Sequence, residues 1–512
     1  MESLSDEVWD VVIAGTSIPQ SLLALALSRS GKKILHVDRH AYYGGDDAGL
    51  SLDDAQSWVE DLRQFRSTVY KDAFISRYTD DESRTPSSLG PSRSYTLSLS
   101  PQIIYAKSEF LPSLVSSQIH TQLEFLAVGS FWVLDDGKLH KIPSTREDVF
   151  NDESLSMKDK RGLMKFLRYV IQEEEESTTA SKEDSTSMSL KDALTTEFKI
   201  PDSLQAPLVA LALSPVPADS VPFDKALVRI RRHMKSMGHF GQGFGAVVAK
   251  YGGTAEISQV ACRAGAVGGG VYLLGHALQA LSAPANTPVL APLDGGDSTL
   301  VECTLSDGTR IRTRYVAGNR DDIPISKDVV EEVASLCTTW RSIHIIADPL
   351  KSMFPPTSEN GPIPAVTIVL VNGGTPEHGK DPVYLQIHSE DTGECPAGQC
   401  LIYASVVSED ASSEDRLEDA VRLFLDTVGA KDTLLWSLSY RALGPAIDRT
   451  FNSPPSRKHT PVIIFPPKPQ DIAFDDGILH AVNDAWQVIM GSEAATRSTF
   501  LRFEERDTEL ED

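Results

Sequence analysis

Apolar residues at the start of the chain alternate between strand-like and helix-like patterns. Val8–Ala14 is an apolar, β-branched run that predicts a buried parallel strand. Ser21–Arg29 is rich in Leu and Ala and predicts a helix, and Ile34–Val37 predicts a second strand that ends at Asp38. An acidic residue at this distance from the first strand is typical of the strand–helix–strand units that bind dinucleotides.

The turn after the first strand lacks two of the three glycines that a dinucleotide requires. In place of G-x-G-x-x-G the chain has GTSIPQ, which begins at Gly15. Ser17 puts a Cβ where the phosphates would lie, and Gln20 adds bulk where helix and strand must pack closely. Pro19 removes one N–H from the start of the helix. We therefore predict a nucleotide-binding scaffold that holds no cofactor; a flavin-dependent oxidoreductase is the alternative from another functional class.

Further along, the periodicity becomes helical. Asp159–Gln172 is amphipathic and predicts a surface helix, and Ser189–Leu213 predicts two more helices broken at Pro201 and Pro207. Glu173–Met188, between them, is acidic and rich in Ser and Thr, so we expect a surface loop there.

These patterns divide the chain into a mixed α/β host and a helical insertion. We expect residues 1–143 and 225–512 to form a large domain with a degenerate dinucleotide-binding fold. We expect residues 144–224 to form a smaller, all-helical domain, and a start near residue 111 stays open.

Other stretches predict single elements. Leu50–Tyr70 and Ser413–Val428 have helical periodicity, and residues 288–347 and 364–407 are rich in strand-forming residues. Three glycines followed by Val271–Leu274 predict a turn into a buried strand.

Composition and charge narrow the classes of function. A net charge of −24 and an isoelectric point of about 4.9 argue against nucleic acid and anionic membrane surfaces as main partners. Five scattered cysteines do not form a disulfide framework, so we expect a reducing, cytoplasmic setting. The opening residues are acidic, and we expect no secretory leader. No Ser-His-Asp, paired-carboxylate or Cys/His constellation is readable, so we predict no catalytic and no metal-binding residues.

Three sequence blocks, in order, resemble one protein superfamily. The first is KKILHVDRHAYYGG at Lys32–Gly45, the second spans Arg93–Phe131, and the third is YGGTAEISQVACRAGAVGGGVYLL at Tyr251–Leu274. They resemble the superfamily of Rab escort proteins and Rab GDP dissociation inhibitors. The stretch 146–169, with its DVF and KR-x-LMKFL motifs, is more similar to the escort proteins. A recycling GDP dissociation inhibitor is the alternative.

The resemblance implies a fold and a set of partners. The fold is a flavin-monooxygenase-like large domain with an inserted helical domain. The implied partners are GDP-bound Rab GTPases, the α/β heterodimer of Rab geranylgeranyltransferase, and the geranylgeranyl groups of the product. Such a protein is a non-catalytic accessory subunit, cytoplasmic with transient membrane association.

The resemblance also places a Rab-binding platform on matching positions of this chain: Tyr43, Glu256, Gln259 and Arg263, with Arg39 at its flank. On a helix, the pattern E-x-x-Q-x-x-x-R puts its three polar side chains roughly on one side. An Arg there can bind carboxylates or backbone oxygens of a partner. The alternative is an ordinary solvated helix face.

Lys225–Gly241 predicts a basic helix, which is unusual in so acidic a chain. It resembles the region near which escort proteins contact the transferase. This gives four candidate contacts: Arg229, Arg232, His233 and Phe240. The alternative is an ordinary basic face that complements the acidic remainder.

Prenyl groups require apolar cover. Burying a CH₂ group contributes about 0.8 kcal/mol, so a protein that carries two geranylgeranyl chains must offer extensive apolar surface. The helical insertion supplies Met164 and Leu167 as candidates, although a plain helical core is the alternative use of both. Leu111, Leu114 and Val115 are candidates for a patch that binds the Rab C-terminal tail.

Overall fold

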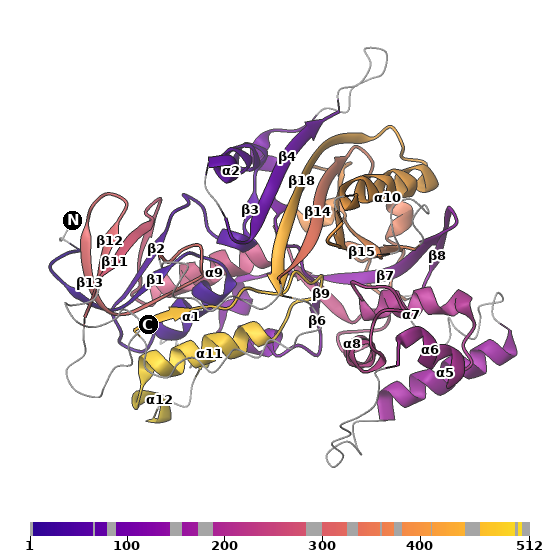
Figure 1. Cartoon of the computed structure of the whole chain (residues 1–512), viewed down its shortest axis with the longest axis horizontal. Coiled ribbons are helices and arrows are strands. Elements are labelled where there is room, and N and C mark those ends of the chain that lie inside the picture. The colour runs from indigo at the N-terminus through magenta and orange to yellow at the C-terminus, as the bar shows by residue number, and fades with distance from the viewer. Residues whose placement is uncertain are drawn as a thin grey trace, which may run out of the picture.

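Two β-sheets with helices packed against them organise the molecule (Figure 1). The computed structural model describes residues 4–64, 67–78, 89–143, 156–172, 188–282, 300–324, 336–358, 361–372, 381–410, 412–445, 461–496 and 500–503. The predicted mixed α/β class is confirmed.

The first sheet contains the strand–helix–strand unit expected at the start of the chain. Its strands, in spatial order, are β10 (Val271–Leu274), β2 (Ile34–Asp38), β1 (Val8–Ala14), β13 (Arg310–Gly318), β12 (Val301–Leu305) and β11 (Leu278–Ser282), with β19 (Val462–Ile464) beside β13. Strands β10, β2, β1, β13 and β19 run parallel, whereas β11 and β12 form an antiparallel extension. The expected parallel core of a dinucleotide-binding fold is therefore present.

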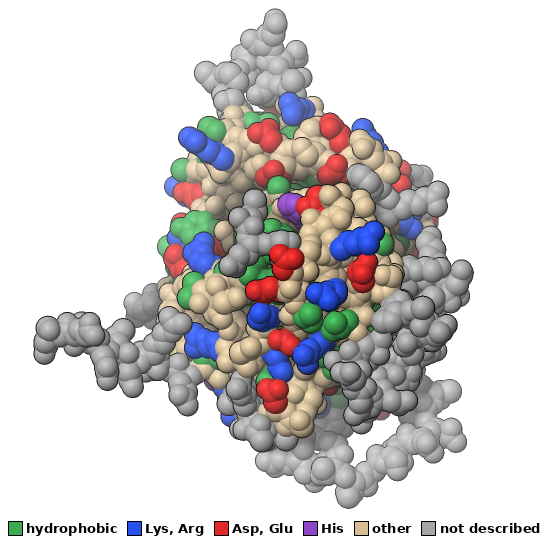
Figure 2. Space-filling view, turned by 90° about the vertical axis from the view of Figure 1, so that its left-hand side faces the viewer, with side chains coloured by type: hydrophobic (Ala, Val, Ile, Leu, Met, Phe, Trp, Pro, Cys, Tyr) green, Lys and Arg blue, Asp and Glu red, His purple; other side chains and the backbone are tan. Residues whose placement is uncertain are grey.

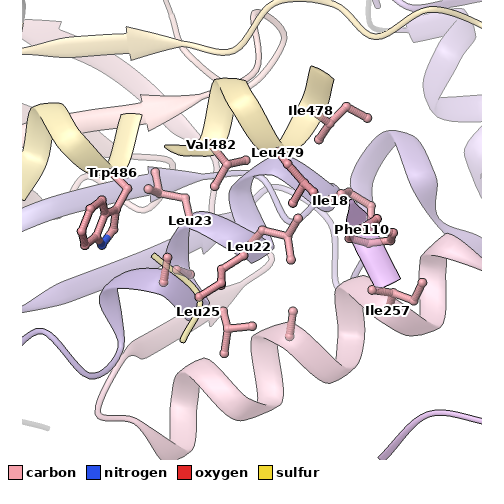
Figure 3. Packing of buried hydrophobic residues seen from close by; sticks show 14 of the residues in the cluster. Ile18, Leu22, Leu23, Leu25, Phe110, Ile257, Ile478, Leu479, Val482 and Trp486 are labelled. Atoms are coloured by element: carbon pink, nitrogen blue, oxygen red, sulfur yellow. The ribbon is translucent and has the colours of Figure 1, made fainter. Parts of the chain in front are cut away.

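Helix α1 (Ile18–Leu27) is almost entirely buried between other elements. Figure 3 shows its Leu22 and Leu25 on the side that faces α9 (Thr254–Val267) and its Leu23 on the side of Trp486 in α11 (Gly477–Met490). Because full burial of one such side chain contributes roughly 1.5–3 kcal/mol, this cluster holds α9 firmly against the first sheet.

The second sheet is larger and forms the centre of the molecule in Figure 1. Its order is β4 (Tyr70–Arg77), β18 (Leu434–Pro445), β14 (Leu336–Ile346), β17 (Cys400–Val407), β16 (Val383–His388), β15 (Val366–Val371), β7 (Phe125–Asp135), β9 (Ala246–Ala249) and β6 (Ile104–Tyr105), with β8 (Lys138–Lys141) paired to β7. Helix α10 (Ser413–Val428) contacts β14, β16 and β17. The remaining short elements are α2 (Leu52–Gln64), α3 (Phe110–Ser116), α12 (Glu493–Thr496), and the strand pair β3 (Gly49–Leu50) and β5 (Leu97–Ser98).

The helical layer lies at the lower right of Figure 1 and comprises α5 (Met157–Gln172), α6 (Leu190–Thr196), α7 (Gln205–Ala212) and α8 (Phe223–Ser236). Helix α8 contacts α5, α6 and α7, so the layer continues past the predicted boundary at residue 224. Its apolar side chains share one core with β7, β9 and β15 of the second sheet. The predicted start at residue 144 and most of the predicted acidic loop lie outside the described residues.

Several expected elements differ from the observed ones. The helix expected over Leu50–Tyr70 ends at Gln64, and Tyr70 begins β4 instead. Pro207 does not break a helix but lies in the first turn of α7, where its missing N–H costs no helical hydrogen bond. The strand predicted to be buried over Val271–Leu274 is β10, whose side chains are exposed or half-buried, because among the described strands it pairs only with β2 and lies at the sheet edge.

Candidate functional site

A polar stripe lies along the outer side of α9. Glu256 is half-buried, whereas Gln259 and Arg263 are exposed. The opposite side of the helix, which includes Ile257 and Val260, is fully buried against α1. The sequence spacing therefore produces the expected arrangement, in which all three polar side chains share one face.

Two close contacts fix the position of α9. The Sγ atom of Cys262 lies 3.2 Å from Oγ of Ser21 on α1. A Cβ atom on Gly265 would lie 2.4 Å from Oη of Tyr272, so glycine permits strand β10 to approach the helix. The polar stripe consequently sits on a rigid support.

Tyr43 comes from the loop after β2 and lies near this stripe. Burial and the neighbouring Cys262 raise the pKa of its hydroxyl, while the positive charge of Arg263 acts in the opposite direction. Burial also raises the pKa of Glu256, again against the influence of Arg263. The charge of Arg263 therefore acts on both the loop residue Tyr43 and the helix residue Glu256.

Exposed apolar side chains flank both ends of the stripe. Tyr251 precedes α9 and is 51% exposed, and Val267 in its last turn is 70% exposed. Val271, at the start of β10, is 38% exposed. Polar groups with apolar neighbours are typical of a protein-binding surface. Sequence reasoning did not single out Tyr251 or Val267, because their exposure depends on the packing of the helix ends.

Arg39, four residues before Tyr43, is exposed and also contacts acidic groups of the chain itself. Its guanidinium donates to the carbonyl oxygen of Asp321 at 3.3 Å and lies 3.9 Å from the carboxylate of Asp322. Both aspartates follow β13. Arg39 therefore neutralises acidic groups at the ends of the parallel strands.

The former nucleotide turn is closed by the chain's own side chains. Ser17 and Gln20 are buried, and Gln20 donates to Asp322 Oδ2 at 3.1 Å. A Cβ atom on Gly15 would lie 2.2 Å from that same oxygen. Asp38, the acid that in a dinucleotide fold binds a ribose, instead accepts a hydrogen bond of 2.6 Å from Thr16.

Charge makes the turn a poor site for a dinucleotide. Burial and the nearby Asp321 raise the pKa of Asp46 to about 6, and Asp47 accepts from the backbone N–H of Ile18 at the start of α1. These carboxylates lie where a pyrophosphate would bind, and two anions repel. The adjoining cavity, lined in part by Lys468 and Phe465, has a volume of about 60 Å³, too small for a flavin. The residues present do not fit the group.

The outer side of the first sheet carries both signs of charge. Figure 2 shows Lys and Arg interspersed with Asp and Glu on the end of the molecule that lies at the left of Figure 1. On β13, Arg310 lies 3.9 Å from Glu302 and Arg314 lies 3.6 Å from Asp10. The net charge of the whole chain therefore does not describe this face.

Two features are absent from the described residues. No helix in the ranges given above is long and apolar enough to cross a membrane. Within those same ranges, no three His, Cys, Asp or Glu side chains are grouped so as to hold a metal ion.

Comparison with known families identifies the chain. A sequence profile described as "GDP dissociation inhibitor" matches residues 5–433, which include the nucleotide turn and α9. The chain belongs to the GDP dissociation inhibitor family. The resemblance stated from the three sequence blocks is thereby confirmed.

Individual members of this family are similar over most of the chain. The relative named "Rab proteins geranylgeranyltransferase component A" in Saccharomyces cerevisiae is 29% identical over 80% of this chain. Its counterpart in Candida albicans is 27% identical over 79% of this chain. A "Probable secretory pathway GDP dissociation inhibitor 1" of Schizosaccharomyces pombe is 24% identical and spans 82% of this chain and 84% of its own length. The chain spans 64% and 60% of the length of the two component A relatives.

Solved structures agree on the fold. The Rab GDI of Plasmodium falciparum has a TM-score of 0.61 at 19% identity, covering 95% of this chain and 98% of its own. A putrescine oxidase has a TM-score of 0.53 at 12% identity, covering 94% and 99%. The predicted relationship of the large domain to FAD-binding oxidoreductases is therefore confirmed for the fold.

The candidate transferase contacts of this family member fall into two groups. Arg229 forms hydrogen bonds of 2.7 and 2.9 Å to the carboxylate of Asp471, and His233 is only 4% exposed. Arg232 stacks over the ring of Tyr105 at 4.8 Å. These three side chains hold α8 against the large domain, and the buried His233 has no surface with which to reach a partner.

Phe240 is the exception among these candidates. It follows α8 and is 49% exposed. Its ring lies 5.1 Å from that of His239, which is also exposed. An exposed aromatic pair on a loop is suited to protein contact.

The candidates for the Rab tail and the prenyl groups also divide. Val115 on α3 is 52% exposed, whereas Leu114 is 1% exposed and belongs to the core beneath. Leu111 is half-buried against that core. On α5, Met164 and Leu167 are half-buried, and Leu167 packs against the helical core. Leu114 is thus a core residue rather than part of a surface patch.

Proposed function

We propose that this chain is a Rab escort protein. It binds GDP-loaded Rab GTPases, presents them to Rab geranylgeranyltransferase, and delivers the prenylated Rab to membranes. A single observation carries the proposal: Tyr43 lies near Arg263 of the polar stripe on α9, although the two are more than two hundred residues apart in the sequence. The matching positions form the Rab-binding platform that the resemblance implies.

Two features support an escort protein over a recycling inhibitor. The stretch 146–169 has the escort-like KR-x-LMKFL motif, and two relatives similar over about four fifths of the chain are named as transferase components. A GDP dissociation inhibitor that recycles prenylated Rabs remains the alternative, because the family contains both and some relatives carry that name.

The protein acts without catalysis of its own. The support is the nucleotide turn. Asp47 accepts the hydrogen bond that the start of α1 would donate to a phosphate, and the side chain of Gln20 lies where a dinucleotide-binding fold has glycine. A flavin-dependent oxidoreductase would need that turn open. Purified protein that contains a stoichiometric flavin would overturn this part of the proposal.

Delivery of a prenylated product calls for apolar cover. Val115 and the half-buried Leu111 form a small apolar area on α3 that suits the Rab C-terminal tail. The half-buried Leu167 packs at the edge of the helical core, where a prenyl chain would displace it, and Met164 is half-buried on the same helix. Membrane contact in this scheme is transient and occurs through the Rab.

Reconstituted prenylation tests the proposal. Purified Rab, transferase heterodimer and geranylgeranyl diphosphate are combined with and without this protein, and prenyl transfer to the Rab is measured. An escort protein makes transfer depend on its presence. An inhibitor binds GDP-loaded Rab but does not support transfer, so Rab binding without transfer would identify the alternative. Absence of binding to GDP-loaded Rab would overturn both.

A further inference from the structure

The nucleotide turn and the loop that carries Tyr43 are joined by side-chain hydroxyl groups. Oγ1 of Thr16 donates to Asp38 Oδ2 at 2.6 Å and accepts from the backbone N–H of Gly44 at 2.9 Å. Oγ of Ser17 accepts from the backbone N–H of Asp46 at 3.1 Å. In a dinucleotide-binding fold, this turn makes its contacts to phosphate instead.

A carboxylate takes the position of the phosphate at the start of α1. Asp47 Oδ2 accepts from the backbone N–H of Ile18 at 3.1 Å, and its other oxygen pairs with Lys468. Asp47 is 2% exposed and Lys468 is 12% exposed, so this pair is protected from solvent and from salt. The loop is therefore anchored by the same N–H groups that bind an anion in related folds.

The backbone between these anchors is tightly folded. Gly44 has a φ of +106°, and a Cβ atom there would lie 2.7 Å from Cα of Ala48. Tyr70 adds a hydrogen bond of 2.6 Å to the carbonyl oxygen of Asp46. Tyr43 is thus held between the strand that ends at Asp38 and an anchored glycine turn.

We propose that the former nucleotide turn is a brace that positions Tyr43 for its partner, with Thr16, Ser17 and Asp47 as positioning residues. This inference rests on the proposed function, because Rab is the partner that Tyr43 would meet. A loop that becomes ordered only on binding loses conformational entropy, which reduces affinity. A loop that is already ordered in the free protein avoids that loss. The turn that no longer fits a cofactor thereby acquires a second use.

The hydroxyl group of Thr16 can be removed with little change in shape by Thr16→Val. Thr16→Ser restores the hydroxyl and serves as the rescue variant. Thr313→Val is the matched control, since Thr313 is equally buried and donates to the carbonyl oxygen of Tyr315 at 2.9 Å. It lies on β13 opposite Trp9, near the end of β1 away from Thr16. Asp47→Asn is a second test that keeps the acceptor for Ile18 and removes the ion pair.

Two measurements are made on each variant: amide hydrogen exchange of residues 39–48 in the free protein, and affinity for GDP-loaded Rab. Thr16→Val removes both hydrogen bonds of Oγ1. It is expected to speed exchange at Gly44 and to weaken Rab affinity about tenfold, which equals the net contribution of about one buried hydrogen bond. Thr16→Ser is expected to restore both values. Asp47→Asn should shift both in the same direction as Thr16→Val, and Thr313→Val should change neither.

Unchanged loop exchange in Thr16→Val and in Asp47→Asn would overturn the brace. So would faster exchange with unchanged Rab affinity, because Tyr43 would then not depend on the anchored loop. An equal loss of affinity in Thr313→Val would also overturn it, since the loss would then report general destabilisation. If the wild-type protein binds no Rab, the proposed function fails instead, and exchange alone decides whether the loop is anchored.

Discussion

Arg229 and Asp471 form a buried, two-point ion pair that joins the helical layer to the large domain. The guanidinium of Arg229 also donates to the carbonyl oxygens of Ala212 and Leu213, at 2.6 and 2.7 Å. Burial by itself would raise the pKa of Asp471, but the adjacent Arg229 outweighs it and lowers that pKa. The carboxylate of Asp471 is therefore charged in the interior, and Arg229 compensates that charge.

Arg229→Ala is expected to lower the free energy of unfolding by about 3–5 kcal/mol, because it leaves the charge of Asp471 buried and unpaired. Denaturant unfolding measures the change. Arg168→Ala, an exposed Arg on α5 in the same layer, is the control and should change stability by less than about 0.5 kcal/mol. Equal effects of the two substitutions would contradict the structural role of Arg229.

Arg263→Glu is expected to weaken binding of GDP-loaded Rab about 30-fold or more, because an exposed Arg at the centre of a protein contact is a typical hot spot. Isothermal titration calorimetry with a purified Rab measures the change. Arg310→Glu makes the same charge change at a residue 76% exposed on β13, away from α9, and should leave affinity unchanged. Similar losses in both variants would indicate general electrostatics and not a specific platform.

Phe240→Ala is expected to reduce affinity for the transferase heterodimer about tenfold while binding of GDP-loaded Rab stays unchanged. The reason is that Phe240 is exposed beyond α8, whereas the other candidates on that helix are engaged within the protein. Analytical ultracentrifugation or calorimetry with the purified heterodimer measures the change. Val228→Ala, which removes a residue 62% exposed on α8, tests whether the contact extends along the helix. Full transferase affinity in Phe240→Ala would remove the last of the four candidates.

Stability is expected to fall as the pH is lowered toward 4. Burial lowers the pKa of His36, His233 and His344 to about 4, from 6.5. Between these values the unfolded chain binds protons that the folded protein does not, so the free energy of unfolding decreases with falling pH, by at most about 3 kcal/mol per imidazole. Asp46 acts in the opposite direction, because its folded pKa of about 6 exceeds its unfolded value of 3.8.

Denaturant unfolding at about pH 7 and about pH 5 measures this dependence. His344→Gln removes one titrating group from β14, away from α9 and from the nucleotide turn, and should make the dependence shallower. Parallel pH profiles of the variant and the wild type would contradict the buried, neutral state of His344.

The sequence predicted well those elements whose pattern is local. The strand at Val8–Ala14 and the helix at Ser413–Val428 have the expected bounds. Strand β4 was missed because its alternation is weak and its identity depends on pairing with β18. The helix at Lys225–Gly241 was expected from its pattern, but the use of its basic residues was not, since Asp471 lies far along the chain.

For the candidate site, the spacing of Glu256, Gln259 and Arg263 was sufficient to place them on one side of a helix. The replacement of two glycines of the dinucleotide motif by Ser17 and Gln20 was also visible in the sequence. The sequence did not show which side chains occupy the turn. Asp47 follows the turn closely in sequence but belongs to no recognisable motif, and Lys468 lies in a Pro-rich segment without periodicity. Long-range ion pairs leave no local pattern.

By itself, the sequence determined the class of this protein, because hydrophobic periodicity and missing glycines are properties of short stretches. It determined a nucleotide-type frame with an altered turn, and three blocks that identify the family. Only the tertiary structure decided which polar residues are exposed and which are engaged within the fold. Arg229 and His233 have surface-like chemistry, yet packing places a carboxylate and an aromatic ring beside them. Burial is a property of the whole fold, and no stretch of sequence specifies it alone.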